Sequence, residues 1–106
     1  MPVVEPSTFG TRLKEARLRA GLSQKRLGIA AGLDDFVAST RINRYELGIH
    51  QADYPFACKL AVVLDVPVAF FYANDANLAE LIDRYGKAPK KRQAAILAMA
   101  REGLTL

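Results

Sequence analysis

The 106-residue sequence has no tryptophan, a single histidine and a single cysteine. Cys58 excludes an intrachain disulfide and any multi-cysteine zinc site, and this usage is typical of a reducing cytoplasm. We interpret Cys58 as a small packed hydrophobic residue. His50 alone does not supply the imidazole ligands of a histidine-based metal centre. We therefore expect neither a metal nor a cofactor.

Long apolar runs and enzyme motifs are also absent. No stretch of about 18 uncharged apolar residues occurs, and the start lacks a basic flank followed by an apolar segment, which predicts a cytoplasmic protein. The sequence contains no glycine-rich phosphate loop and no Gly-x-Ser-x-Gly motif. Asp34 and Asp35 are the one adjacent carboxylate pair that invites a catalytic interpretation, and a helix cap explains them. An enzyme is not expected.

The residues that are present fit one small domain, with or without an extension at one end, and predict a modest core. Hydrophobic residues make up 51% of the chain, charged residues make up 25%, and the net charge is +4. Basic residues outnumber acidic ones six to two in residues 1–33 and six to three in 76–106, whereas residues 34–75 carry three basic and six acidic groups. This balance permits a polyanionic partner without identifying one.

Helical periodicity and helix-capping residues recur along the chain, and no strand-like alternation occurs. We interpret residues 1–6 as a loose arm. Helices are predicted from Thr8 to Gly21, Ser23 to Gly32, Asp34 or Asp35 to Gly48, Asp53 to about Asp65, Pro67 to Tyr72, about Asn77 to Tyr85, and Pro89 to Arg101, with a turn from Gly86 to Pro89. A polar cluster near 73–77 divides an all-α chain into a domain at 7–73 and a C-terminal helical extension at 74–106.

The third predicted helix is polar on one side. Its spacing directs Ser39, Thr40, Asn43 and Arg44 toward water and keeps Ile42 and Tyr45 for a core. In the helix before it, Gly28 costs roughly 1 kcal/mol relative to alanine. That cost is tolerable if another helix crosses closely there, and a neutral surface glycine is the alternative.

Several elements at fixed spacing resemble the XRE or phage-repressor-like helix-turn-helix family. These elements are R17-LRA-G21-L22-S23-Q24-KR-L27-GIA-A31-G32-L33, then I42-N-R44-Y-E46-L-G48, and later L60-A61-VV-L64-D-V66. The resemblance covers roughly residues 9–72. It implies a five-helix repressor-like DNA-binding domain whose third helix enters the major groove of double-stranded DNA.

The resemblance also implies roles for individual residues. Ser23 caps the second helix, Gln24 contacts DNA, and Arg17 pairs with Glu46 as an internal brace. The base-reading positions fall on Ser39, Thr40, Arg41, Asn43 and Arg44. These residue types suit the task, because arginine bonds guanine bidentately and asparagine suits adenine.

One departure from the family pattern precedes Ser39. The five residues 34–38 precede Ser39, and four of these positions count as extra relative to the family pattern, which is about one helical turn. Either the third helix begins a turn early, with Phe36 and Val37 packed inward, or the preceding turn is longer. In both cases Asp34 and Asp35 lie near the side that meets phosphate.

Other charged and apolar groups leave alternatives open. Arg12, Lys14, Arg19, Lys25 and Arg26 either bind a polyanion or form solvated helix faces, and the motif favours a phosphate contact for Lys25 or Arg26. His50 either contacts phosphate or is merely exposed. The basic run of Lys87, Lys90, Lys91 and Arg92 either extends a DNA footprint or is a solvated helix start. The apolar segment AAILAMA at 94–100 is expected to be buried, against the domain or against a second copy.

These observations predict a sequence-specific transcriptional regulator of prokaryotic or phage type, a repressor, acting as a homodimer through residues 77–102. The alternative is an antitoxin-type protein that binds a toxin partner and represses its own operon. A third interpretation is an interaction module that has lost DNA binding, for which the acidic residues at 34 and 35 give slight support.

Overall fold

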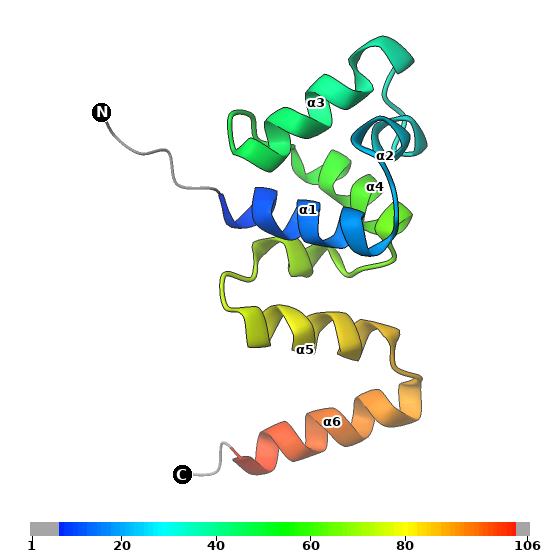
Figure 1. Cartoon of the computed structure of the whole chain (residues 1–106). Helices are drawn as coiled ribbons and strands as arrows, with labels where there is room; N and C mark the ends of the chain where they lie inside the picture. The colour runs from blue at the N-terminus through cyan, green and yellow to red at the C-terminus, as the bar shows by residue number, and fades with distance from the viewer. Residues whose placement is uncertain (1–6, 104–106) are drawn as a thin grey trace, which may run out of the picture.

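The computed structural model describes residues 7–103, whose regular structure is entirely helical (Figure 1). The elements are α1 (Thr8–Arg19), α2 (Gln24–Ala30), α3 (Asp35–Leu47), α4 (Tyr54–Leu64), the 3-10 helix η1 (Val68–Tyr72), α5 (Ala76–Lys87) and α6 (Lys90–Gly103). The predicted all-α fold is confirmed. The loose arm predicted for residues 1–6 lies outside the described residues.

Side-chain caps begin the helices at the positions that the sequence predicts. The cap oxygens of Ser7, Ser23, Asp34 and Asp53 accept hydrogen bonds from the backbone N–H groups of Gly10, Arg26, Phe36 and Phe56, at 2.9, 3.0, 3.3 and 2.8 Å. Each bond satisfies one of the donors that a helix start leaves unpaired. At the other end of α3, Gly48 has a φ of 77°, the left-handed conformation that ends the helix.

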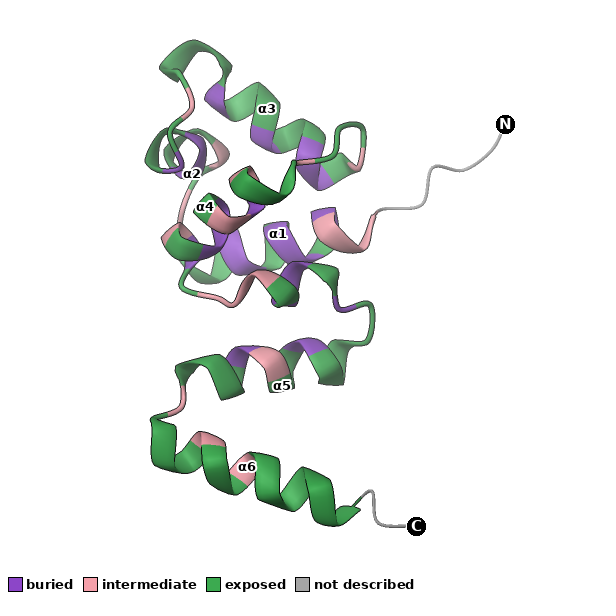
Figure 2. Ribbon diagram, turned by 180° about the vertical axis from the view of Figure 1, so that it is seen from behind, coloured by how far each residue is buried: buried purple, intermediate pink, exposed green. Residues whose placement is uncertain are grey.

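The core lies between α1, α2, α3, α4 and η1. Its largest fully buried side chains are Leu13, Leu27, Ile42, Leu60, Phe70 and Phe71. Phe70 and Phe71 come from η1 and close the base of the core as expected, although η1 is a 3-10 helix and not an α-helix. Figure 2 shows that buried positions concentrate in the upper part of the molecule and become sparse toward α6.

Two glycines allow close approach to α3 at its two ends. A Cβ at Gly28 of α2 would lie 2.8 Å from the Ala38 Cβ and 3.0 Å from its Cα. A Cβ at Gly10 of α1 would overlap the backbone carbonyls of Tyr45 and Glu46. Helices that approach this closely have no room for a side chain at the crossing, so α3 is held tightly near both its first and last turns. For Gly28, the close-crossing alternative is the correct one.

The first turn of α3 resolves one alternative and corrects another expectation. The helix begins at Asp35, so residues 34–38 extend it and do not form a longer turn. The prediction that Phe36 and Val37 pack inward is wrong, because the two residues are 92% and 40% exposed. Ala38 takes the inward position instead and is completely buried. The physical reason is that only a small side chain fits against Gly28.

The C-terminal helices differ from their prediction in two respects. α5 continues through Gly86 to Lys87, so the turn begins two residues later than expected. α6 contacts α5 but contains no buried residue, so the expected burial of residues 94–100 against the domain is wrong for this chain. Burial of residues 94–100 against a second copy remains a prediction. Within residues 7–103, no helix is long and apolar enough to cross a membrane.

Two arginines of α1 secure the segment that leads into α5. Arg12 is buried and donates from Nε to the Ala73 carbonyl at 2.8 Å. Arg19 pairs with Asp83 of α5 at 3.1 Å and lies over the Phe70 ring. For Arg12, neither a polyanion-binding role nor a solvated helix face describes what the structure shows, because its guanidinium is buried. Arg19 is half exposed, so it lies on a solvated helix face while it joins α1 to α5.

Candidate functional site

The outer face of α3 carries the five side chains for which base reading was expected. Ser39, Thr40, Arg41, Asn43 and Arg44 are all exposed. The opposite face of α3 is buried through Ala38, Ile42 and Tyr45. The helix thus presents hydroxyl, amide and guanidinium groups to solvent from a backbone that the core fixes.

Arg17 and Glu46 form a buried, bidentate ion pair between α1 and the last turn of α3. Arg17 Nε donates to Glu46 Oε2 at 2.6 Å, and Nη2 donates to Oε1 at 3.1 Å. The side chains are 10% and 3% exposed. A third donor, Arg17 Nη1, bonds the Leu22 carbonyl at 2.9 Å in the turn before α2. This one guanidinium therefore joins α1, the turn and α3, and a fork geometry of this kind is the strong form of an ion pair.

Gln24 connects this ion pair to the exposed face of α3. Its amide Nε2 donates to Glu46 Oε1 at 3.0 Å and to Asn43 Oδ1 at 3.1 Å. Since the donor must meet an acceptor, the carbonyl side of the Asn43 amide faces Gln24. A hydrogen-bonded path therefore runs from the buried Arg17 to the exposed Asn43. Sequence reasoning assigned Gln24 to DNA and did not find this contact, because the spacing within each helix does not reveal which side chains meet between helices.

Lys25 also has a partner that the sequence did not indicate. Its Nζ lies 3.2 Å from Asp35 Oδ1, and both side chains are more than half exposed. This pair sits where the extra turn of α3 meets α2, so it partly neutralises one of the two carboxylates near the exposed face. In water such a pair is weak, so the ammonium remains able to meet a phosphate.

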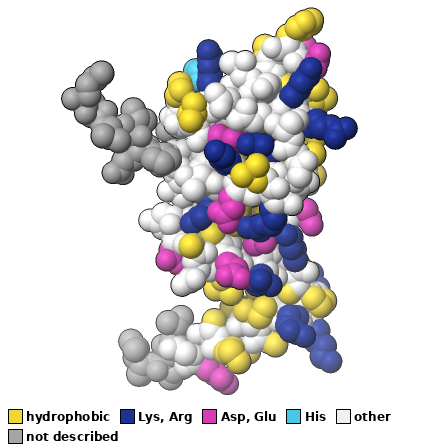
Figure 3. Space-filling view, viewed as in Figure 1, with side chains coloured by type: hydrophobic (Ala, Val, Ile, Leu, Met, Phe, Trp, Pro, Cys, Tyr) yellow, Lys and Arg dark blue, Asp and Glu magenta, His cyan; other side chains and the backbone are white. Residues whose placement is uncertain are grey.

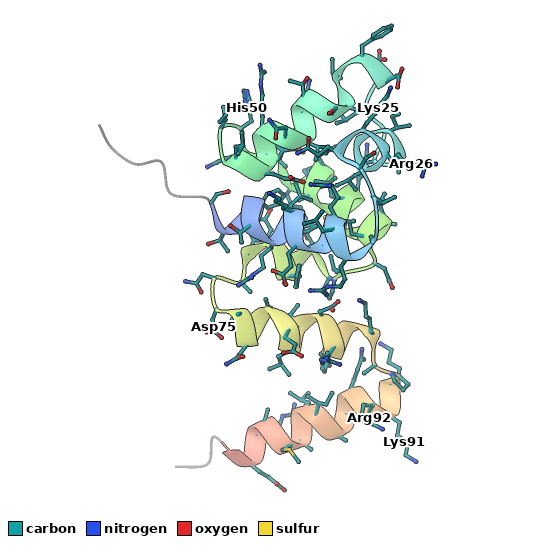
Figure 4. All side chains as sticks on the ribbon, in the orientation of Figure 1. Lys25, Arg26, His50, Asp75, Lys91 and Arg92 are labelled. Atoms are coloured by element: carbon teal, nitrogen blue, oxygen red, sulfur yellow. The ribbon has the colours of Figure 1, made fainter. Side chains whose placement is uncertain are left out.

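Other basic groups lie around the same end of the molecule. Figure 4 shows Lys25 and Arg26 on α2 near the start of α3, and His50 beyond its C-terminal end. Arg26 and His50 are exposed. In the space-filling view, basic side chains flank the upper part of the molecule, where α2 and α3 lie (Figure 3). Basic side chains thus lie at both ends of the α3 face.

The C-terminal basic run does not lie beside α3. Lys91 and Arg92 project from the start of α6, at the opposite end of the molecule from α3 (Figure 4). Lys87 is engaged by Asp83 at 3.0 Å. In a single chain, therefore, this run does not continue the surface formed by α3.

Cys58 and possible metal ligands lie outside this arrangement. Cys58 is half-buried on α4, and its hydrogen bond with Tyr54 raises the pKa of the tyrosine. Among residues 7–103, no three His, Cys, Asp or Glu side chains are grouped so that they could hold a metal ion.

Comparison with known proteins identifies a family and a similar solved structure. Residues 8–69 match the model of a family described as helix-turn-helix domain. A solved structure, the crystal structure of transcriptional regulator BswR, has a TM-score of 0.82 and 41% sequence identity to this chain. The match covers 88% of this chain and 92% of that chain, so it must extend past residue 69 into the C-terminal helices. No curated protein matches.

Proposed function

The chain belongs to the helix-turn-helix domain family, and from that premise we propose that it is a sequence-specific regulator of transcription that binds double-stranded DNA. In this proposal α3 enters the major groove, and residues 7–73 form the DNA-binding domain. The finer assignment is to the XRE or phage-repressor-like group, with a repressor role. Similarity to a solved transcriptional regulator at 41% identity supports the general assignment.

The outer face of α3 is the observation that carries the proposal. Arg44 and Arg41 offer the bidentate donors that suit O6 and N7 of guanine. Asn43 offers the donor and acceptor that suit adenine, since its Oδ1 has a second lone pair besides the one that accepts from Gln24. Ser39 and Thr40 can bond a base edge or a phosphate. All five side chains are exposed on a helix whose other side is buried. A rigid helix with these exposed groups can read a base sequence. A mobile helix would bind more weakly, because ordering it on binding costs free energy.

Contacts with phosphate would supply most of the affinity and little of the specificity. Lys25 on α2 is our first candidate for such a contact, with Gln24 beside it. Gln24 also holds Asn43 and Glu46, so it acts in this proposal both at the DNA surface and as a support for the reading face.

The C-terminal extension, residues 74–106, is proposed to join two copies into a homodimer. Leu78 and Leu81 of α5 and Leu97 and Met99 of α6 are exposed. Figure 3 shows hydrophobic side chains gathered over the lower part of the molecule, where these helices lie. A dimer of this kind would place two copies of α3 on half-sites about 34 Å apart.

Selection of bound duplexes from a random pool tests the proposal. We expect an enriched palindromic sequence, two chains bound to each duplex, and an affinity that falls steeply as salt rises. If no duplex is enriched and no salt-dependent binding occurs, the protein is not a DNA-binding regulator and the interaction-module interpretation replaces this one.

The exposed face of α5 and α6 also favours a second candidate, an antitoxin-type protein that holds a toxin partner there and represses its own operon. The two candidates share the DNA-binding surface and differ in what covers α6. A second small protein that co-purifies with this chain in a fixed ratio, and that dissociates when Leu97 or Met99 is replaced by glutamate, would favour the antitoxin.

A further inference from the structure

We propose that Phe36 contacts the 5-methyl group of a thymine in the major groove, and so extends the reading face of α3 by one helical turn. The inference rests on the proposed function and adds to it a specificity-determining residue. Phe36 belongs to the extra turn at the start of α3, outside the five positions expected to read bases.

Phe36 stands on the same side of α3 as the polar reading residues. Thr40 follows it by four positions and Asn43 by seven, which are the spacings of one helix face. Ile42 and Tyr45 occupy the opposite, buried face. Phe36 is 92% exposed. A surface that meets a ligand through Thr40 and Asn43 therefore brings Phe36 toward the same ligand.

The turn that carries Phe36 is well fixed. Asp34 Oδ1 accepts a hydrogen bond from the Phe36 N–H at 3.3 Å. Ala38, two residues later, is fully buried where Gly28 of α2 crosses α3. The backbone that presents the ring therefore loses little freedom when the ring binds, because it is already ordered.

The chemistry of this turn favours a base edge over the DNA backbone. Two carboxylates, Asp34 and Asp35, stand beside Phe36 and repel phosphate. A phenyl ring offers no hydrogen bond, so among the groups in the major groove its natural contact is the thymine methyl. An apolar protein partner is the other occupant that Phe36, Val37 and the nearby exposed Ile29 would suit. The register of Phe36 with Thr40 and Asn43 favours DNA.

Replacement of thymine by deoxyuridine in the selected duplex tests the inference, because it removes only the methyl group. Each thymine is replaced in turn, symmetrically in both half-sites, and the Kd is measured at fixed salt for the wild-type protein and for Phe36→Ala. Burial of one methyl group corresponds to about fourfold in affinity for each contact. At one thymine position, we expect replacement by deoxyuridine to weaken binding of the wild-type protein by about that factor per half-site. At the same position, the replacement should not weaken binding of Phe36→Ala.

Val62→Ala is the matched control, since Val62 is 81% exposed on α4 and off the α3 face. It should retain the wild-type preference for thymine over deoxyuridine. Circular dichroism melting verifies that Phe36→Ala folds, as the exposure of the ring predicts, and Phe36→Leu tests whether a smaller apolar group keeps part of the preference.

Three results overturn the inference. One is a Phe36→Ala variant that still distinguishes thymine from deoxyuridine as the wild type does, at every position. Another is unchanged binding to both duplexes together with a smaller sedimenting species, which would assign Phe36 to a protein interface. The third is that no duplex is selected at all, in which case the proposed function fails together with the inference about Phe36. Failure of the methyl effect alone leaves the proposed function standing.

Discussion

Helices α3 and α6 have nearly the same length, 13 and 14 residues, but entirely different surroundings. α3 buries Ala38, Ile42, Tyr45 and Glu46, whereas α6 buries none of its residues. Helices of this length are marginal in water when they stand alone. The conformation of α3 is therefore set by the core of the domain, and that of α6 depends on contacts with α5 and, in our proposal, on a second copy.

The different surroundings of α3 and α6 suit the two helices to different roles. A helix that reads DNA must be ordered before it binds, because ordering it at that moment would cost affinity. A helix that joins two chains can leave its apolar side uncovered in the monomer, since the partner covers it. The buried ion pair and the two glycine contacts lie on α3. Both helices expose apolar side chains, but α6 has no buried face to oppose its exposed Leu97 and Met99.

Loss of the Arg17–Glu46 pair should have the largest effect, because this pair holds α3 against the rest of the domain. Arg17→Met removes the guanidinium and leaves Glu46 buried without its charge partner. We expect the free energy of unfolding to fall by about 3 to 5 kcal/mol. DNA affinity should fall as well, because Gln24 and Asn43 depend on the same network. Chemical denaturation and binding to the selected duplex measure the two effects.

Arg84→Met supplies the matched control, because the Arg84–Glu80 pair has side chains that are 76% and 58% exposed. It should change the free energy of unfolding by less than about 1 kcal/mol. Equal, small effects of the two substitutions, with DNA affinity unchanged, would show that Arg17 does not brace α3.

A methyl group added at the α2–α3 crossing should have the next largest effect. Gly28→Ala forces the helices apart, because the new Cβ would lie 2.8 Å from that of Ala38. Overpacking of this kind costs about 1 to 3 kcal/mol, and the better helix propensity of alanine offsets roughly 1 kcal/mol of it. We expect a net loss in thermal stability.

Gly103→Ala makes the same chemical change on α6, where a Cβ would meet open space. It should leave stability unchanged or raise it by up to about 1 kcal/mol. A stabilising effect at both positions would mean that α2 and α3 do not cross as closely as the structure places them.

Charges introduced on α6 should have the smallest effect on folding. Leu97→Glu and Met99→Glu alter exposed side chains, so at concentrations where the chain is monomeric we expect the free energy of unfolding to change by no more than about 0.5 kcal/mol. At higher concentration the same variants should fail to dimerise. Analytical ultracentrifugation measures dimerisation, and chemical denaturation measures the free energy of unfolding. A large loss of monomer stability would contradict the account of α6.

The sequence predicted the helices well because their ends are encoded locally. Ser23, Asp53 and Gly48 act through groups a few residues away, so a reader of the sequence can find them. The same holds for Ile42 and Tyr45, whose burial follows from helical spacing. The Arg17–Glu46 contact spans 29 residues and came from the family resemblance, because no local pattern contains it.

Contacts between helices could not be predicted in the same way. Phe36 was expected inside and Ala38 received no role, because the choice depends on how closely Gly28 crosses α3. In the sequence Arg12 resembled a surface cation, whereas in the fold it donates a hydrogen bond to the Ala73 carbonyl. Burial of residues 94–100 was expected from their apolar character, either against the domain or against a second copy. Within this chain α6 buries none of its residues, because apolar character alone does not say which surface covers a helix.

Binding of Arg44→Ala to a set of single-base variants of the selected duplex tests the central claim, that α3 reads bases, most directly. Arg44→Ala should relax discrimination at one base pair of each half-site by about 1 to 3 kcal/mol and leave discrimination elsewhere intact. Lys25→Ala, measured alongside it, should weaken binding to all sequences alike. If Arg44→Ala instead reduces binding to every duplex equally, Arg44 does not read a base and the account of α3 is contradicted.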